Sequence, residues 1–191
     1  VVNSVTEILK NYEVDGIHFD DYFYPSVDDS QESRWFDYPE YQKSGSTKTA
    51  AQWRRDQVSD LVARVYKTVK AEKPSVTFGI SPQGYFGNLR SDTQVFADID
   101  RWLTQDGFVD YMMPQLYWGF EAKTSDGSPA SFAFTANLKS WTDLVKKGHA
   151  KLYLGLAMYR AGTNVSDHNT VSEWLSHDDI ISRQVLVGRA G

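Results

Sequence analysis

Four short apolar runs, rich in β-branched and aromatic residues, alternate with helical patterns along the chain. The runs cover residues 16–23, 76–81, 109–118 and 152–159. The clearest helical pattern covers about 51–73, where Val58, Val62, Val65 and Val69 recur at helical spacing before Pro74 ends it. Strands that alternate with helices in this way predict βαβ units and a parallel sheet.

Further helical patterns cover about 94–105 and 136–147, and two more open and close the chain. Thr135 is the expected N-cap of the 136–147 helix, and Gly148 follows its end. The chain has 191 residues, a length typical of one domain, and does not start with Met. We therefore expect residues 1–191 to be a single partial domain taken from a longer protein.

The alternation within each run predicts which side chains face the helices. Residues that point outwards from a barrel pack under helices and are apolar, which places Ile17, Phe19, Phe78 and Ile80 outside. The opposite positions then point inwards. The polar residues that this parity brings to the carboxyl ends of the strands are His18, Asp20, Asp21, Ser81, Gln115, Tyr117 and Tyr159.

Long connections follow the predicted strands, above all residues 25–50, whereas the connections from helix to strand are short. Active sites of parallel sheets lie outside the carboxyl ends of the strands and are built by such loops. None of the strands is followed by a glycine-rich phosphate-binding motif, which disfavours a nucleotide site.

Aromatic residues gather in the same loops. Ring faces suit the apolar C–H groups of sugars, and carboxylates between them suit the hydroxyls; a small secondary core under a long loop is the alternative explanation. The residues concerned are Tyr22, Phe23, Tyr24, Trp35, Phe36, Tyr38, Tyr41, Tyr85, Phe86, Trp118 and Phe120.

Composition removes several other classes of function. The net charge is −5, whereas a nucleic-acid-binding protein shows a basic face. No apolar run approaches the roughly 18 residues of a membrane span. The chain has no cysteine, which excludes disulfides, thiolate metal sites and cysteine nucleophiles.

Five segments together resemble one known family. They are Val14-Asp-Gly-Ile-His-Phe-Asp-Asp-Tyr-Phe-Tyr-Pro25, Trp53-Arg-Arg-Asp56, Phe78-Gly-Ile-Ser-Pro82, Tyr111-Met-Met-Pro-Gln-Leu-Tyr-Trp118 and Gly155-Leu-Ala157. In order and content they resemble the glycosyl hydrolase-like 10 family of bacterial cell-envelope proteins.

The resemblance implies a fold, a substrate and a location. It implies an α/β fold, the C-terminal part of a (β/α)₈ TIM barrel, whose four parallel strands correspond to strands four to seven. It implies a glycosidase without a cofactor, acting on peptide-free peptidoglycan glycan strands outside the cell or in the bacterial envelope. A half-barrel exposes sheet edges, so self-association of the chain is also expected.

Glycoside hydrolysis usually needs two carboxyl groups. Asp20 is the expected nucleophile or stabilising carboxylate; a structural ion pair with Arg54 or Arg55 is the alternative. Asp21 is either catalytic or a cap of the loop, and Glu121 is the nearest candidate acid after the third strand. The expected substrate-binding residues are His18, Tyr22, Tyr24, Arg54, Ser81, Gln115, Tyr117, Trp118 and Tyr159.

Two other functions stay open at this stage. His18 with Asp20 or Asp21 could hold a metal, as in carbohydrate deacetylases, but no second histidine falls on an inward strand position. A non-catalytic glycan-binding module would keep the aromatic groove without the chemistry. Arg54 is expected to reach a carboxylate on an acidic sugar, because a guanidinium binds carboxylates through two hydrogen bonds; an ion pair between elements is the alternative.

Overall fold

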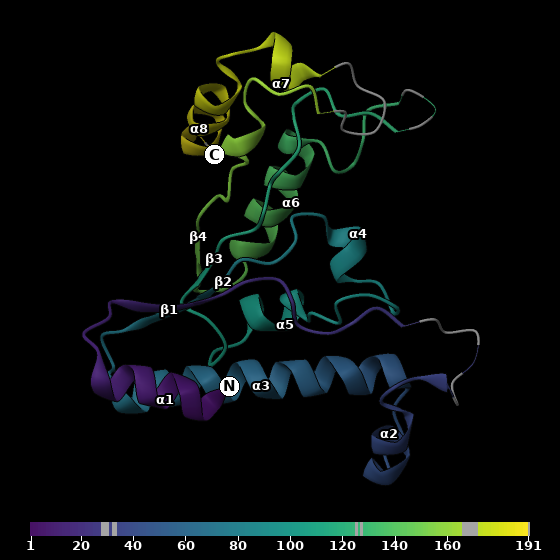
Figure 1. The fold of residues 1–191 in the computed structure, drawn as a ribbon, viewed down its shortest axis with the longest axis vertical. Coiled ribbons are helices and arrows are strands. Elements are labelled where there is room, and N and C mark those ends of the chain that lie inside the picture. Colours follow the sequence, from purple (N-terminus) through teal and green to yellow (C-terminus); the bar gives the residue numbers. More distant parts are fainter. Residues whose placement is uncertain (28–30, 32–33, 125, 127, 166–171, 191) are drawn as a thin grey trace.

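The computed structural model describes residues 1–27, 31, 34–124, 126, 128–165 and 172–190. Four strands form one parallel sheet in the order β1-β2-β3-β4 (Figure 1). The strands are β1 (Gly16–Phe19), β2 (Thr77–Ile80), β3 (Tyr111–Met112) and β4 (Lys151–Leu152). The fold is therefore α/β, with the strands in chain order, as expected for part of a (β/α)₈ barrel.

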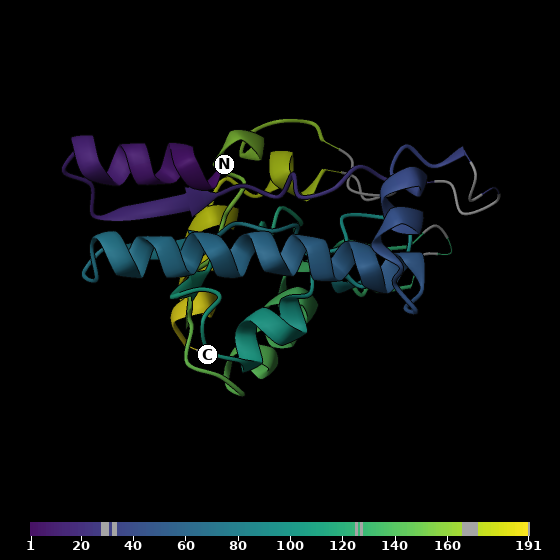
Figure 2. The ribbon, with the colours of Figure 1, turned by 90° about the horizontal axis from the view of Figure 1, so that it is seen from below.

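Helices occupy the connections between these strands. The longer helices are α1 (Val2–Asn11), α3 (Ala50–Glu72), α6 (Phe134–Val145) and α8 (Ile180–Ala190). The shorter ones are α2 (Tyr38–Ser44), α4 (Phe86–Leu89), α5 (Ile99–Thr104), α7 (Glu173–Ser176) and the 3₁₀ helix η2 (Met158–Arg160). Seen from below, α3 lies between α1 and β1 on one side and α5 and α6 on the other (Figure 2).

One face of the sheet is buried under helices and the other is open. The outward residues Phe78, Ile80 and Met112 have no exposed surface and belong to the main core. On the opposite face, His18 and Tyr153 remain exposed. This confirms the faces predicted for β1, β2 and β3 and distinguishes the sheet from a doubly wound one, in which helices cover both faces. Tyr159, in contrast, lies in η2 rather than on a strand.

The long helix α3 shows why its ends lie where they do. The Thr49 side chain accepts a hydrogen bond from the backbone N–H of Gln52, and the Gln52 side chain accepts one from the backbone of Thr49. This capping box satisfies two N–H groups at the start of the helix. The helix ends two residues before Pro74, in agreement with the sequence.

One predicted helix and the predicted strands are shorter than their patterns. The helix expected from residue 94 begins at Ile99, because Val95 and Phe96 have positive φ angles of 55° and 53°, which a right-handed helix does not allow. The strands also stop early, but isolated parallel bridges from Gln83 to Gln115 and from Gln115 to Gly155 continue the sheet towards its carboxyl edge.

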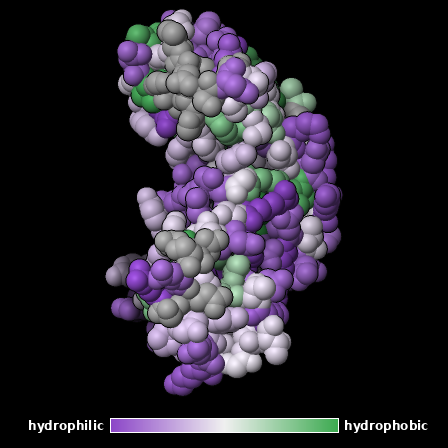
Figure 3. All heavy atoms as spheres, turned by 90° about the vertical axis from the view of Figure 1, so that its right-hand side faces the viewer, coloured by the Kyte–Doolittle hydropathy of each residue, from purple (hydrophilic) through white to green (hydrophobic). Residues whose placement is uncertain are grey.

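The loops that follow β1 and β2 lie on the right-hand side of Figure 1. Viewed from that side, the molecule has a crescent outline, and hydrophilic residues predominate over small hydrophobic patches (Figure 3). No helix in the described part of the chain has the length and apolarity needed to cross a membrane.

Candidate active site

A cleft of about 220 Å³ lies at the carboxyl edge of the sheet. Segments that follow all four strands contribute to it, as expected for a barrel whose loops build the active site. Its lining residues are Asp21, Gln83, Gly84, Asn88, Gln115, Tyr117, Trp118 and Arg160.

Asp20 follows β1 and is held by an amide from across the sheet. Its Oδ1 accepts hydrogen bonds from Nε2 of Gln115 at 2.7 Å and from the backbone N–H of Asp21 at 2.8 Å. Gln115 Nε2 also donates to the carbonyl oxygen of Ser81 at 3.1 Å. Because Gln115 sits at two backbone bridges, its amide presents a fixed donor to the exposed Asp20 carboxylate.

Asp21 lies beside Asp20 in a different environment. Burial and the negative charge of Asp20 raise the pKa of the half-buried Asp21 carboxyl, whereas a hydrogen bond from Gln83 opposes the shift. Gln83 in turn accepts a hydrogen bond from Nδ2 of Asn88 at 2.9 Å. Two neighbouring carboxyl groups whose environments differ can serve as an acid and a base in one reaction.

His18 and Tyr111 support the site from the inner face of the sheet. His18 Nδ1 lies 2.9 Å from the Tyr111 hydroxyl, and the two rings stack with centroids 5.9 Å apart. Gly79 is required here, because a Cβ atom at this position would lie 2.1 Å from the Tyr111 ring. His18 points inwards, as the strand alternation predicts.

Tyr117 and Tyr159 form one aromatic side of the site. Their rings meet edge to face with centroids 6.0 Å apart. Burial and the neighbouring Tyr159 raise the pKa of the Tyr117 hydroxyl, so Tyr117 stays a hydrogen-bond donor at neutral pH. Tyr159 itself is 67% exposed, which leaves its ring available to a ligand.

The segment after β3 is fixed by two buried polar side chains near the C-terminus. The Glu173 carboxylate accepts the backbone N–H groups of Phe120 at 3.1 Å and Glu121 at 2.9 Å. Gln184 Nε2 donates to the carbonyl oxygen of Trp118 at 3.0 Å. Sequence patterns did not identify Glu173 or Gln184, because a buried polar residue on a helix cannot be told from a solvated one by its sequence alone.

Two expected substrate-binding residues, Arg54 and Tyr24, instead donate hydrogen bonds to Asp37 away from the cleft, which corrects their assignment. Arg54 is 1% exposed and donates two hydrogen bonds to Asp37, at 2.6 and 2.8 Å. The Tyr24 hydroxyl donates to the same carboxylate at 2.6 Å. Arg54 forms the ion pair that the sequence left as an alternative, although with Asp37 rather than Asp20, so its guanidinium is buried away from any sugar.

The remaining candidates are spread around the site. Ser81 is 5% exposed, and its carbonyl group, rather than its hydroxyl, makes the contact with Gln115. Tyr22 is 92% exposed and lines a second hollow of about 320 Å³ together with His18 and Asp20. Glu121 is exposed on the segment that Glu173 holds. Asp20 thus lines the second hollow and accepts a hydrogen bond from Gln115, which lines the first.

The described residues contain no group of three or more His, Asp or Glu side chains placed to hold a metal ion. The deacetylase alternative, which needs such a group, therefore gains no support from this part of the chain.

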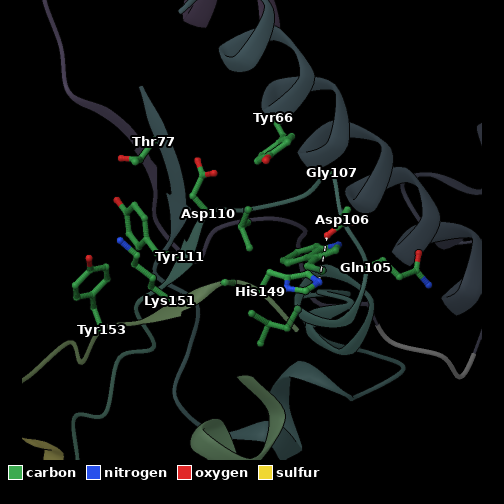
Figure 4. Close-up of a pocket in the computed structure, with 14 residues that line it drawn as sticks. Tyr66, Thr77, Gln105, Asp106, Gly107, Asp110, Tyr111, His149, Lys151 and Tyr153 are labelled. Carbon is green, nitrogen blue, oxygen red and sulfur yellow. Dashed lines mark ion pairs between the residues drawn. The ribbon is translucent and has the colours of Figure 1, made fainter. Parts of the chain in front are cut away.

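A larger hollow of about 390 Å³ lies at the amino ends of β2, β3 and β4 (Figure 4). It brings together Asp110, Tyr111, Tyr153 and an exposed pair of Asp106 and His149, in which Nε2 of His149 lies 3.9 Å from Oδ1 of Asp106. In barrel enzymes this end serves stability, whereas catalysis lies at the carboxyl end. We therefore place the candidate site at Asp20.

Comparison with known proteins identifies relatives and a family. The chain is 38% identical over 175 residues to glycosyl hydrolase DigH of Escherichia coli (strain K12), covering 85% of this chain and 37% of that protein. It is 34% identical over 206 residues to glycosyl hydrolase YngK of Bacillus subtilis (strain 168), covering 99% of this chain and 37% of that protein. The family model for glycosyl hydrolase-like 10 matches residues 1–174, and the chain belongs to this family.

Proposed function

We propose that the chain carries part of the active site of a glycosidase in which Asp20 acts as nucleophile or as the carboxylate that stabilises an oxocarbenium-like transition state. The observation that carries the proposal is the pair of neighbouring carboxyl groups after β1, with Asp20 fixed by Gln115. The two N–H donors to Oδ1 of Asp20 hold this carboxylate in a fixed orientation, which both roles require.

Asp21 is the proposed proton donor. Its raised pKa keeps the carboxyl protonated to a higher pH than an ordinary aspartic acid, as general acids need. Glu121 is the alternative donor, because it is exposed and comes shortly after Trp118, which lines the cleft. The chain spans 37% of the length of the relatives named above, and a further carboxylate from elsewhere in the full-length protein fits the same scheme.

Peptide-free peptidoglycan glycan strands are the proposed substrate, and the outside of the cell or the bacterial envelope is the proposed location. The aromatic side chains Tyr117, Trp118 and Tyr159 support a sugar-binding cleft, because their rings can pack against pyranose faces. Both relatives are named glycosyl hydrolases, which supports glycosidic cleavage without naming the glycan.

Digestion of defined glycans with the full-length protein tests this function. Peptide-free glycan strands, strands that keep their peptides, and chitin oligosaccharides are each incubated with the enzyme, and the products are identified by mass spectrometry. We expect shorter saccharides from the peptide-free strands. Binding of these strands without any shortened product would instead identify a non-catalytic glycan-binding module.

A further inference from the structure

We propose that Arg160 binds a carboxylate on the sugar, so that this cleft is specific for an acidic glycan; the proposal rests on the function proposed above. Arg160 is the only lysine or arginine among the described residues that line the 220 Å³ cleft. The segment after β4 contributes Arg160 to this cleft, and the segment after β1 contributes Asp21.

Two aromatic rings lie beside the guanidinium group of Arg160. Its Cζ atom lies 5.7 Å from the centre of the Tyr159 ring and 6.0 Å from that of Trp174, and its Nε donates to the Tyr159 hydroxyl at 3.3 Å. Trp174 is 1% exposed and therefore fixed. A guanidinium carries five N–H donors in a planar fork, so Arg160 can donate to a sugar carboxylate while it keeps its contacts with the protein.

The charges around the cleft explain why an acidic sugar needs such a residue. The Asp20 carboxylate stands beside the cleft, and the whole chain has a net charge of −5. These charges repel a negatively charged glycan, whereas they do not repel a neutral one. A positive side chain in the cleft therefore favours acidic over neutral sugars, and its position determines which sugar ring can lie next to the carboxylates.

The other arginine considered for this role cannot fill it. Arg54 forms a buried ion pair with Asp37, and its guanidinium lies 4.3 Å from the centre of the Trp35 ring. Binding a substrate carboxylate there would require that pair to break inside the core, at a large cost in stability. Arg160, in contrast, borders the cleft itself.

The experiment compares two substrates of equal length in the full-length protein. One is peptide-free peptidoglycan strands, whose lactyl groups carry free carboxylates, and the other is the same strands with these carboxylates reduced to alcohols. We expect wild type to have the lower KM for the acidic strands. Arg160→Met should raise this KM on the order of ten- to a hundredfold, the value of one charge-assisted hydrogen-bonded pair, and leave the KM for reduced strands nearly unchanged.

Two further variants make the result specific. Arg160→Lys keeps the positive charge but loses the planar set of N–H donors, and should give an intermediate KM for the acidic strands. Arg183→Met is the matched control, because Arg183 also lies over an aromatic ring, 4.7 Å from the centre of Phe120, but does not line the cleft. It should leave the preference for acidic strands intact.

Equal KM changes for both substrates in Arg160→Met would show that Arg160 only supports the fold, and would overturn the proposal. So would an unchanged KM for the acidic strands. If wild type cleaves neither substrate, the glycosidase function fails, but calorimetric binding of both strands to wild type, Arg160→Met and Arg160→Lys still decides the role of Arg160. If Arg160→Met does not fold, the KM or affinity of Arg160→Lys for the two strands decides it.

Discussion

The contacts of Arg54 illustrate how one side chain can fix a long loop. Asp37 comes from the segment between β1 and α2, whereas Arg54 belongs to α3, and Trp35 and Phe96 lie against the guanidinium at 4.3 and 5.2 Å. Burial opposes ionisation, but the hydrogen bonds from Arg54 and Tyr24 lower the pKa of the Asp37 carboxyl below its ordinary value of 3.8. The pair therefore holds the loop beside the active site through a charge that persists in acid.

Asp37→Asn should destabilise the protein by about 3 kcal/mol at pH 7, because it leaves the buried Arg54 without its counter-ion. Since the pKa of Asp37 is lowered on folding, its contribution is complete above pH 3.8 and is lost as the pH falls through the lowered value. Urea unfolding of wild type and variant at pH 7 and in strong acid measures this difference.

Asp60→Asn is the control for that substitution, because Asp60 forms an exposed pair with Arg64 on α3 and should change stability by less than about 1 kcal/mol. An equal loss of stability in Asp37→Asn at both pH values would contradict the assignment of a negative charge to Asp37 in the folded protein.

Asp21 provides a pH test of the chemistry. If it is the proton donor, activity requires its protonated form, which exists below its raised pKa. In wild type kcat should therefore fall as the pH rises through that value. In Asp21→Asn this decline should disappear, and kcat on the natural glycan should fall by about a hundredfold. An unchanged pH profile of kcat in Asp21→Asn would assign the donor role to Glu121 or to another part of the full-length protein.

At the scale of elements, α7 and the segment after β3 form one unit. Glu173 is 3% exposed and holds two consecutive backbone N–H groups of that segment, so its carboxylate has no room to move. Gly119 is next to this contact, and a Cβ atom there would lie 2.0 Å from Oε2 of Glu173. The position of Trp118 in the cleft therefore depends on a glycine and on a residue far away in the sequence.

Gly119→Ala should destabilise the protein by about 1–3 kcal/mol, the usual cost of forcing a methyl group into a packed site. The same substitution in a Glu173→Ala background should cost much less, because the clashing carboxylate is gone. Thermal unfolding of wild type, the two single variants and the double variant gives the coupling free energy between Gly119 and Glu173. Equal costs of Gly119→Ala in both backgrounds would exclude this contact as the reason for the glycine.

Much of the fold could be predicted from the sequence, because alternation and helical spacing report burial directly. The four parallel strands, the inward side of His18 and the ends of α3 follow from such local patterns. The buried pair of Arg54 and Asp37 and the contact of Glu173 with the segment after β3 could not be predicted, because these partners are distant in sequence. The ability of a guanidinium to bind a carboxylate therefore suggested ligand binding for Arg54, a residue that supports the loop.

At the scale of the whole molecule, β1 and β4 each have one neighbour among the described strands. Their outer edges present unpaired backbone groups, and inner-face residues such as Tyr153, 49% exposed, lie open beside them. We expect residues 1–191, expressed alone, to associate. Sedimentation velocity over a range of concentrations tests this, and a monomer throughout that range would show that the open edges do not attract one another.

The central claim is that the Asp20 carboxylate cleaves glycosidic bonds, and Asp20→Asn in the full-length protein tests it most directly. The control is Asp15→Asn, because Asp15 immediately precedes the same strand at its opposite end. We expect kcat on peptide-free glycan strands to fall by about a thousandfold or more in Asp20→Asn, while affinity for these strands and the kcat of Asp15→Asn stay near wild type. Near wild-type turnover in Asp20→Asn would contradict the account and move the catalytic carboxylate away from Asp20.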